Sequence, residues 1–134
     1  MNVYELNQFP NVEFGDEIKR KVRLIVSPET TGEASISIVS VNIPPGGISE
    51  GHVHHETDEY IYFDNCGIAE IDGEVISVNK NSLVFAPRGK KHECRNASLD
   101  QDLNLLCIFI PPFKPYGKYP DLIEKTKTFL NASD

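Results

Sequence analysis

The sequence predicts an all-β protein whose short strands form a sandwich or a barrel. Segments rich in β-branched and aromatic residues recur from residue 22 to residue 110. Turns that contain glycine and proline separate them, such as the run from Pro44 to Gly47 and the pair Pro111-Pro112. Short strands at regular intervals with turns of this kind are typical of sandwich and barrel folds.

Each expected strand is bounded by a turn or a stop. Asp72-Gly73 is the strongest short hairpin signal, because both residue types tolerate the positive φ of a tight turn. Within Ser35 to Ile43 the apolar residues change phase, which indicates a bulge or burial on both faces. In chain order, the strands are expected at Val22 to Val26, Ser35 to Ile43, Tyr60 to Phe63, Ile68 to Ile71, Val75 to Val78, Leu83 to Ala86 and Leu103 to Ile110.

The two ends of the chain depart from this pattern. Residues 1–20 are mixed in character and predict an arm with a short strand or turn. The segment from Asp121 to Leu130 places Leu122, Ile123 and Phe129 near helical spacing, which predicts a short C-terminal helix within about 120–131. We expect a single domain over residues 1–134, with the core of the barrel at about 22–112.

Composition and charge narrow the classes of function. Lys and Arg total 13 against 20 Asp and Glu, so the formal net charge is −7, and an acidic chain without a basic stripe argues against nucleic acid as a partner. No apolar run has membrane-spanning length, and residues 1–5 do not open a signal peptide. Cys66, Cys94 and Cys107 form no Cys-x-x-Cys pair, which favours reduced thiols in a cytoplasmic protein.

Three histidines and one glutamate form the most informative pattern in the chain. His52, His54 and Glu59 stand in one stretch, and His92 stands in a second. Neutral imidazoles and a carboxylate are suitable ligands for iron, manganese, nickel, zinc or copper. His52 and His54 are separated by one residue, so on a strand they point to the same face, and Val53 points away. The pattern therefore predicts a site for one divalent transition metal.

The two stretches resemble the sequence motifs of the cupin family. The first motif reads G-x5-H-x-H-x4-E-x7-G, with one residue more than usual before the last glycine. The second has asparagine in place of its first glycine, a mild departure because asparagine tolerates a left-handed backbone. The matching residues are Gly46, His52, His54, Glu59 and Gly67 in the first motif and Asn81, Pro87, Gly89, His92 and Asn96 in the second.

The resemblance implies a double-stranded β-helix, or jelly-roll, barrel with His52, His54, Glu59 and His92 as metal ligands. It also implies coordination positions left open for a substrate, and a homodimer. The expected function is that of a metal-dependent enzyme acting on a small polar metabolite, as a dioxygenase, a decarboxylase or a sugar isomerase. The alternative is a non-catalytic, metal-containing module that binds a small ligand. Fold alone does not decide between these chemistries.

Strand phase suggests which other side chains line the expected pocket. Ile61 and Phe63 share the phase of Glu59, and Cys94 shares that of His92. Arg88 stands in the turn before His92, where an arginine can hold a carboxylate or phosphate, or can simply be solvated. The segment from Pro111 to Tyr116 can cover the mouth of the barrel or only lead the chain to the terminal helix.

Overall fold

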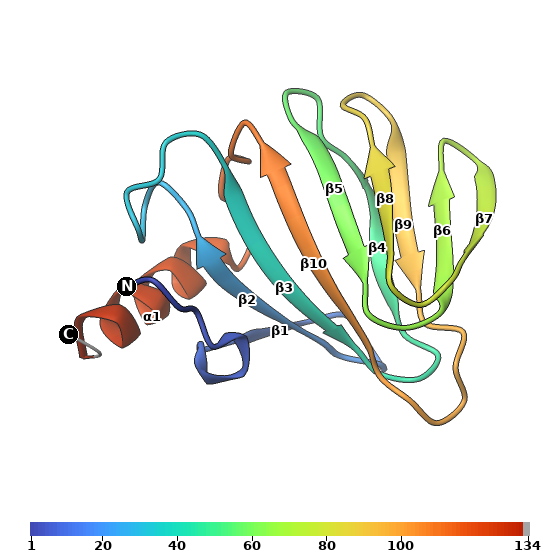
Figure 1. The fold of residues 1–134 in the computed structure, drawn as a ribbon, viewed down its shortest axis with the longest axis horizontal. Coiled ribbons are helices and arrows are strands. Elements are labelled where there is room, and N and C mark those ends of the chain that lie inside the picture. The colour runs from blue at the N-terminus through green and yellow to red at the C-terminus, as the bar shows by residue number, and fades with distance from the viewer. Residues whose placement is uncertain (133–134) are drawn as a thin grey trace.

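The computed structural model describes residues 1–132, without the side chains at positions 50 and 51. Its strands form two antiparallel sheets that face each other (Figure 1). In spatial order, the six-stranded sheet contains β1 (Val12–Phe14), β2 (Arg20–Val26), β3 (Ser37–Ile43), β10 (Leu103–Ile110), β5 (Asp58–Phe63) and β8 (Ser82–Ala86). The four-stranded sheet contains β4 (Ile48–Val53), β9 (Lys91–Arg95), β6 (Gly67–Ile71) and β7 (Glu74–Val78). The predicted all-β jelly-roll barrel is confirmed.

Strand β3 shows how the sequence pattern builds the core. Every second residue, from Ser37 to Ile43, is buried, and the residues between them are half-buried. The phase change predicted a bulge or burial on both faces of this strand. The register shift in fact lies in its neighbour β2, between Leu24 and Val26, while β3 continues regularly opposite it. The extra residue, Ile25, is itself buried, so the bulge adds one apolar side chain to the core.

Two tight turns have the backbone that their sequences predict. Asp72 and Gly73 have φ angles of 51° and 87°, and they join β6 to β7 as a hairpin. Asn81 has φ 63°, the left-handed conformation expected where asparagine replaces a glycine. Its backbone N–H donates to the carbonyl of Phe63, and its side-chain oxygen accepts a hydrogen bond from the Tyr62 hydroxyl at 2.7 Å. These contacts hold the start of β8 against β5.

The strands that carry the histidines have weak local signals. Strand β4 reads ISEGHV and β9 reads KHECR, so charged and small residues dominate them. Each pairs with the other, and β9 also pairs with β6. Their extended conformation therefore depends on neighbours in the sheet more than on local propensity.

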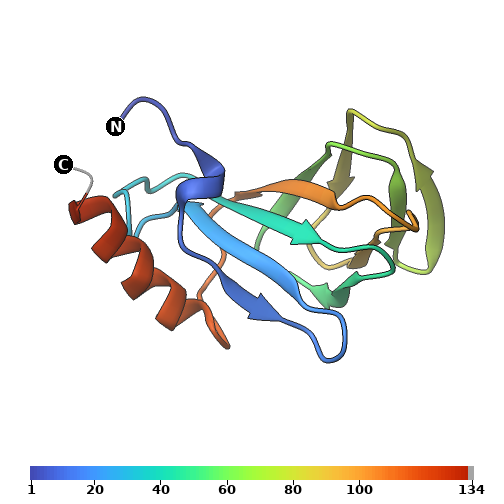
Figure 2. The ribbon, with the colours of Figure 1, turned by 90° about the horizontal axis from the view of Figure 1, so that it is seen from below.

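The N-terminal arm and the C-terminal helix lie close together at the β1–β2 end of the six-stranded sheet (Figures 1 and 2). The arm contains a single turn of 3₁₀ helix, Leu6–Gln8, followed by β1. The predicted C-terminal helix is confirmed as α1 (Tyr119–Ala132), which contacts β2. Its buried residues repeat at helical spacing: Tyr119, Leu122, Ile123 and Thr126. Among the described residues, no helix is long and apolar enough to cross a membrane.

Candidate metal centre

A cavity of about 190 Å³ opens between the two sheets. Strands β2, β3, β5 and β10 line it from one side, and β4 and β9 line it from the other. Five of its polar side chains gather at one place, where His52, His54, Glu59 and His92 lie with Ser49. Most of the remaining wall is apolar, including Val39, Val41, Ile61, Leu105 and Phe109. A polar cluster inside an apolar pocket is the usual construction of a small-molecule site.

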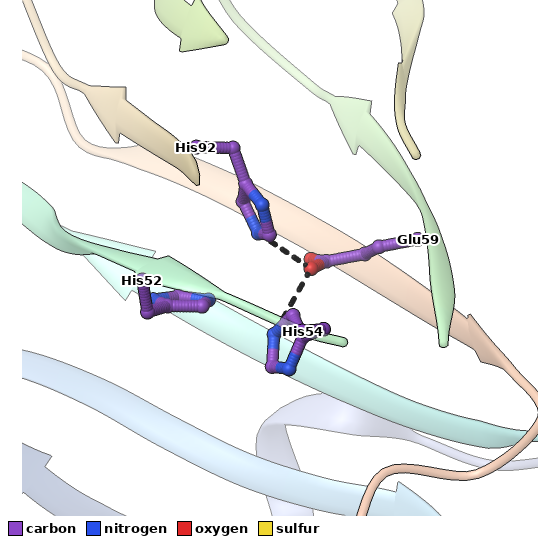
Figure 3. A group of neighbouring side chains, drawn as sticks. All are labelled: His52, His54, Glu59 and His92. Atoms are coloured by element: carbon purple, nitrogen blue, oxygen red, sulfur yellow. Dashed lines mark hydrogen bonds and ion pairs between the residues drawn. The ribbon is translucent and has the colours of Figure 1, made fainter. Parts of the chain in front are cut away.

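The structure brings the four predicted ligands into one group. One ligand atom from each of His52, His54, Glu59 and His92 lies within 4.8 Å of every other. Figure 3 shows the four side chains pointing toward one another, with Glu59 reaching from β5 toward the histidines. His52 on β4 stands directly opposite His92 on β9, and their ring centroids are 4.6 Å apart. Residues from two facing sheets therefore converge on one point.

A register shift in β4 directs the side chain of His52 into the cavity. The β4–β9 pairing slips between Ser49 and His52, so β4 has one residue more than β9 in this interval. In a regular strand, residues three apart point to opposite faces. The bulge reverses that parity, and both Ser49 and His52 face the cavity. Val53 is 37% exposed and points away, as predicted.

Backbone contacts between the two motifs hold the second histidine. His54 follows the last residue of β4, so strand pairing does not hold it. Its carbonyl accepts a hydrogen bond of 2.8 Å from the N–H of Gly89, which has φ 80°. That backbone conformation favours glycine and explains why the second motif has glycine at this turn.

Glu59 is the electrostatic centre of the group. It is 3% exposed, and its Oε1 lies 2.8 Å from Nε2 of His92 and 3.6 Å from Nε2 of His54. Burial lowers the pKa of His92, but the hydrogen bond and the charge of Glu59 outweigh it, so the net shift is upward. For His54, burial and then the neighbouring His52 lower the pKa to about 4. His54 is therefore neutral near pH 7, with a lone pair free to act as a ligand.

The group fits a divalent transition metal. His54 Nε2 is buried and has no hydrogen-bond partner among the described residues. An unsatisfied buried nitrogen costs free energy, and a metal ion is one partner that removes this cost. Three imidazoles and one carboxylate suit iron, manganese, nickel, zinc or copper better than calcium or magnesium, which prefer oxygen ligands. The donor set and the unsatisfied nitrogen point to the same type of ion.

Of the four other residues predicted to line the pocket, the structure places two in the cavity wall. Ile61 and Cys94 line it and are each 2% exposed. Burial, followed by the charge of Glu59, raises the pKa of the Cys94 thiol to about 12. Cys94 is thus a neutral wall residue near pH 7. His55, beside His54, is exposed and lies outside this cluster.

Phe63 and Arg88, the other two, are not among the residues that line this cavity. Phe63 has the predicted inward phase but lies farther along β5, where it is 0% exposed in the core. Arg88 is bound to Asp58: its backbone N–H, Nε and Nη2 donate to the Asp58 carboxylate at 2.9, 3.2 and 3.2 Å. The guanidinium is engaged by a neighbour of Glu59, so Arg88 braces the turn at the base of β5.

Asn96, the last residue of the second motif, holds a loop. Its Nδ2 donates to the carbonyls of Ile43 and Gln101 at 2.9 and 2.8 Å, and its Oδ1 accepts from the N–H of Ser98 at 2.9 Å. The buried amide thereby satisfies backbone groups of three segments.

Several cavity residues come from segments that carry no motif. Phe14 and Arg20 belong to the first two strands, Phe109 to β10 and Tyr119 to α1. The segment after β10 does cover the barrel, since Phe113 and Tyr116 both line the cavity. Only the aromatic composition of that last segment was a signal in the sequence. No sequence signal pointed to Arg20 as a cavity residue, because its position in the cavity wall depends on how the N-terminal arm folds against the barrel.

Comparison with known proteins agrees with this architecture. The model of the cupin domain family matches residues 39–109. The tetracenomycin polyketide synthase protein TcmJ of Streptomyces glaucescens is 24% identical over 75 residues, which cover 55% of this chain and 50% of that protein. The chain thus matches about half the length of this curated relative.

Solved structures show the same fold. A protein described as a predicted oxalate decarboxylase from Thermotoga maritima has a TM-score of 0.73 at 18% identity, over 81% of this chain and 98% of its own. KdgF from Halomonas has a TM-score of 0.66 at 17% identity, over 83% and 94% of the two chains. The family match extends over more than half of the sequence and includes all four residues of the candidate metal centre. This chain belongs to the cupin domain family.

Proposed function

We propose that this protein is a metal-dependent enzyme in which His52, His54, Glu59 and His92 hold one divalent transition metal. One observation carries the proposal: the four ligand atoms lie within 4.8 Å of one another in the wall of a cavity. A structural metal site is normally closed and needs no adjoining space, whereas a catalytic site keeps a position open to substrate. The alternative, a non-catalytic module that binds a small ligand, would have the same geometry. Only turnover of a substrate distinguishes the enzyme from this module.

The proposed metal centre presents a defined charge to a bound substrate. One carboxylate and three neutral imidazoles around a divalent ion leave the centre with a net charge of +1. That charge attracts oxygen atoms that carry or develop negative charge. When bound, a transition metal supplies Lewis acidity and, if it is redox-active, one-electron chemistry. The apolar wall formed by Val39, Val41, Ile61 and Leu105 reduces the local dielectric and strengthens these interactions.

The relatives support small-molecule chemistry of more than one type. One is named as a polyketide synthase protein, and another is described as a predicted oxalate decarboxylase. The proposal includes decarboxylase, dioxygenase and isomerase chemistry, because the fold alone does not decide among them. Metal analysis and an electron paramagnetic resonance spectrum of the purified protein distinguish among these reaction types. Iron or copper together with oxygen uptake favours an oxygenase, and zinc without oxygen uptake favours an isomerase, a lyase or a binding module.

We expect the metal to be open to exogenous ligands. In cobalt-substituted protein, azide or a small carboxylate should shift the visible absorption bands, because a ligand from solution can enter the coordination sphere from the cavity side. Titration with sodium chloride at equal ionic strength controls for screening. A tetrahedral cobalt spectrum that neither azide nor any carboxylate changes means a closed, structural site, and the enzyme proposal then fails.

We also propose that the protein forms a homodimer through the outer face of the six-stranded sheet. Leu83 and Phe85 on β8 and Tyr60 on β5 are 60%, 45% and 37% exposed, and the last two rings stack with centroids 4.9 Å apart. Strand β8 ends the sheet, so its outer edge is unpaired within the described chain. Apolar side chains beside a free sheet edge support self-association.

Replacing Leu83 with glutamate is expected to weaken the dimer at least tenfold, because it places a charge in an apolar contact. The matched control is Val75→Glu, on the exposed face of β7 in the other sheet, which should leave association unchanged. Sedimentation velocity over a range of protein concentrations measures both. Wild-type protein that sediments as a monomer at micromolar concentration refutes this dimer.

A further inference from the structure

Arg20 is a cation in the cavity wall that forms no hydrogen bond or ion pair with the part of the chain that the structure describes. It begins β2, is half-buried and lines the same cavity as the metal cluster. The other arginines are engaged: Arg23 donates to the carbonyl of Phe9, Arg88 pairs with Asp58, and Arg95 pairs with Glu70 and Glu93. Among the described residues Arg20 contacts the ring of Phe14, 5.3 Å from its Cζ, and its charge also acts on Tyr116 and Tyr119. Its five N–H donors are therefore available to a ligand.

A continuous series of aromatic contacts links Arg20 to the metal cluster. Each successive pair of ring centroids lies within ordinary aromatic contact distance, and all these residues line the cavity. From the cluster outward the pairs are His54–Phe109 at 5.2 Å, Phe109–Phe113 at 4.7 Å, Phe113–Tyr119 at 4.8 Å and Tyr119–Phe14 at 5.6 Å. The wall between the two charged ends is thus suited to a flat, apolar body.

A second cation stands near Arg20, on the same aromatic ring. Lys118 places its Nζ 5.6 Å from the centroid of the Phe14 ring that also contacts Arg20. The charge of Arg20 also acts on the tyrosines at the mouth: burial raises the pKa of Tyr116, and Arg20 opposes that rise. A cation next to a low-dielectric wall attracts an anion more strongly than an exposed one. Carboxylates match the planar fork of a guanidinium.

We propose that the cavity binds an aromatic carboxylic acid, with its ring along the aromatic wall, its carboxylate on Arg20 and an oxygen-bearing end toward the metal cluster. This inference rests on the proposed function, because it names the substrate class of the same site. It also revises the expectation of a small polar metabolite. A polar metabolite would leave the rings of Phe14, Phe109 and Phe113 without a complementary surface, and a neutral hydrocarbon would leave Arg20 unpaired.

The test compares acids with neutral analogues of equal size. The probes are 3-phenylpropanoate, 3-(4-hydroxyphenyl)propanoate and 2-naphthoate, each with its primary amide, and the readout is ligand-observed NMR with the metal-loaded protein. Wild-type protein should bind at least one acid at least tenfold more tightly than its amide. Arg20→Gln should lower that preference to the part that the metal alone contributes, while leaving affinity for the amide unchanged, and Arg20→Lys should restore part of the loss. Lys21→Gln makes the same change of charge at an exposed neighbour on β2 and should have no effect.

Two outcomes overturn the assignment. One is that no acid in the series binds better than its amide, and the other is that Arg20→Gln retains the full preference. Far-ultraviolet circular dichroism of each variant identifies any that fails to fold, and Arg20→Lys then provides the comparison. Failure of the proposed function is a different result. If the proposed function fails, the spectrum of cobalt-substituted protein does not respond to anions. The preference for acids that depends on Arg20 would nevertheless persist in the double variant His52→Ala, His92→Ala.

Discussion

Replacing His92 with alanine should remove most of the bound metal and leave the barrel folded. His92 contributes one of the four converging ligand atoms and also hydrogen-bonds Glu59 at 2.8 Å. Loss of groups that merely orient a ligand lowers metal affinity by about 10- to 100-fold, so loss of a ligand itself should cost at least about 100-fold. Metal content by mass spectrometry, together with far-ultraviolet circular dichroism, measures both parts of the expectation.

The neighbouring His55 provides the matched control for this experiment. His55 is exposed, lies outside the cluster and carries the same imidazole, so His55→Ala should retain the wild-type metal content. The double variant His52→Ala, His92→Ala removes the two rings that face each other across β4 and β9. If that variant keeps one equivalent of metal per chain, these residues are not the ligands.

Replacing Phe63 with alanine should destabilise the fold by about 3–5 kcal/mol without changing the ligand preference of the cavity. The ring is 0% exposed and belongs to the core cluster, not to the cavity wall. A Cβ built on Gly67 would come within 2.9 Å of it, which shows how closely the core is packed at this point. Equilibrium unfolding in urea gives the free energy, and NMR with the acid and amide probes gives the preference.

Phe85→Ala is the comparison for this change, because it removes the same ring from a side chain that is 45% exposed. Both changes are made in the Leu83→Glu background, so that differences in self-association do not enter the free energy of unfolding. We expect Phe85→Ala to cost clearly less than Phe63→Ala. Equal costs, or a change of acid preference in Phe63→Ala, would contradict the assignment of Phe63 to the core.

The four residues of the candidate metal centre could be named from the sequence because their spacing within each motif is local. His52 and His54 differ by two positions, and Gly89 and His92 belong to one turn and the strand that follows it. Alternation along a strand then determines which side chains share a face. The same rule correctly directed Ile61 and Cys94 inward. The hairpin at Asp72-Gly73 and the left-handed Asn81 were also predictable, since backbone conformation there follows from residue type.

The alternation of side chains along a strand predicts which face a residue points to. It does not predict where along the strand the cavity lies, or which side chains a residue contacts. Phe63 has the correct phase, but the core occupies its end of β5. Arg88 stands in the expected turn, but Asp58 engages its guanidinium. Both outcomes depend on which residues the fold brings nearby, and those neighbours are distant in the sequence.

By itself, the sequence determined that the chain folds from short antiparallel strands and carries three histidines and a glutamate in the arrangement of a metal site. Only the tertiary structure decided that the bulge in β4 turns His52 inward, and that Arg20, Phe14 and Tyr119 form the far end of the cavity. Residue types and short spacings act through backbone conformation over a few residues. The far end of the cavity, in contrast, is made where β1 and α1 meet the other strands, and that arrangement depends on the burial of side chains from segments far apart in the chain.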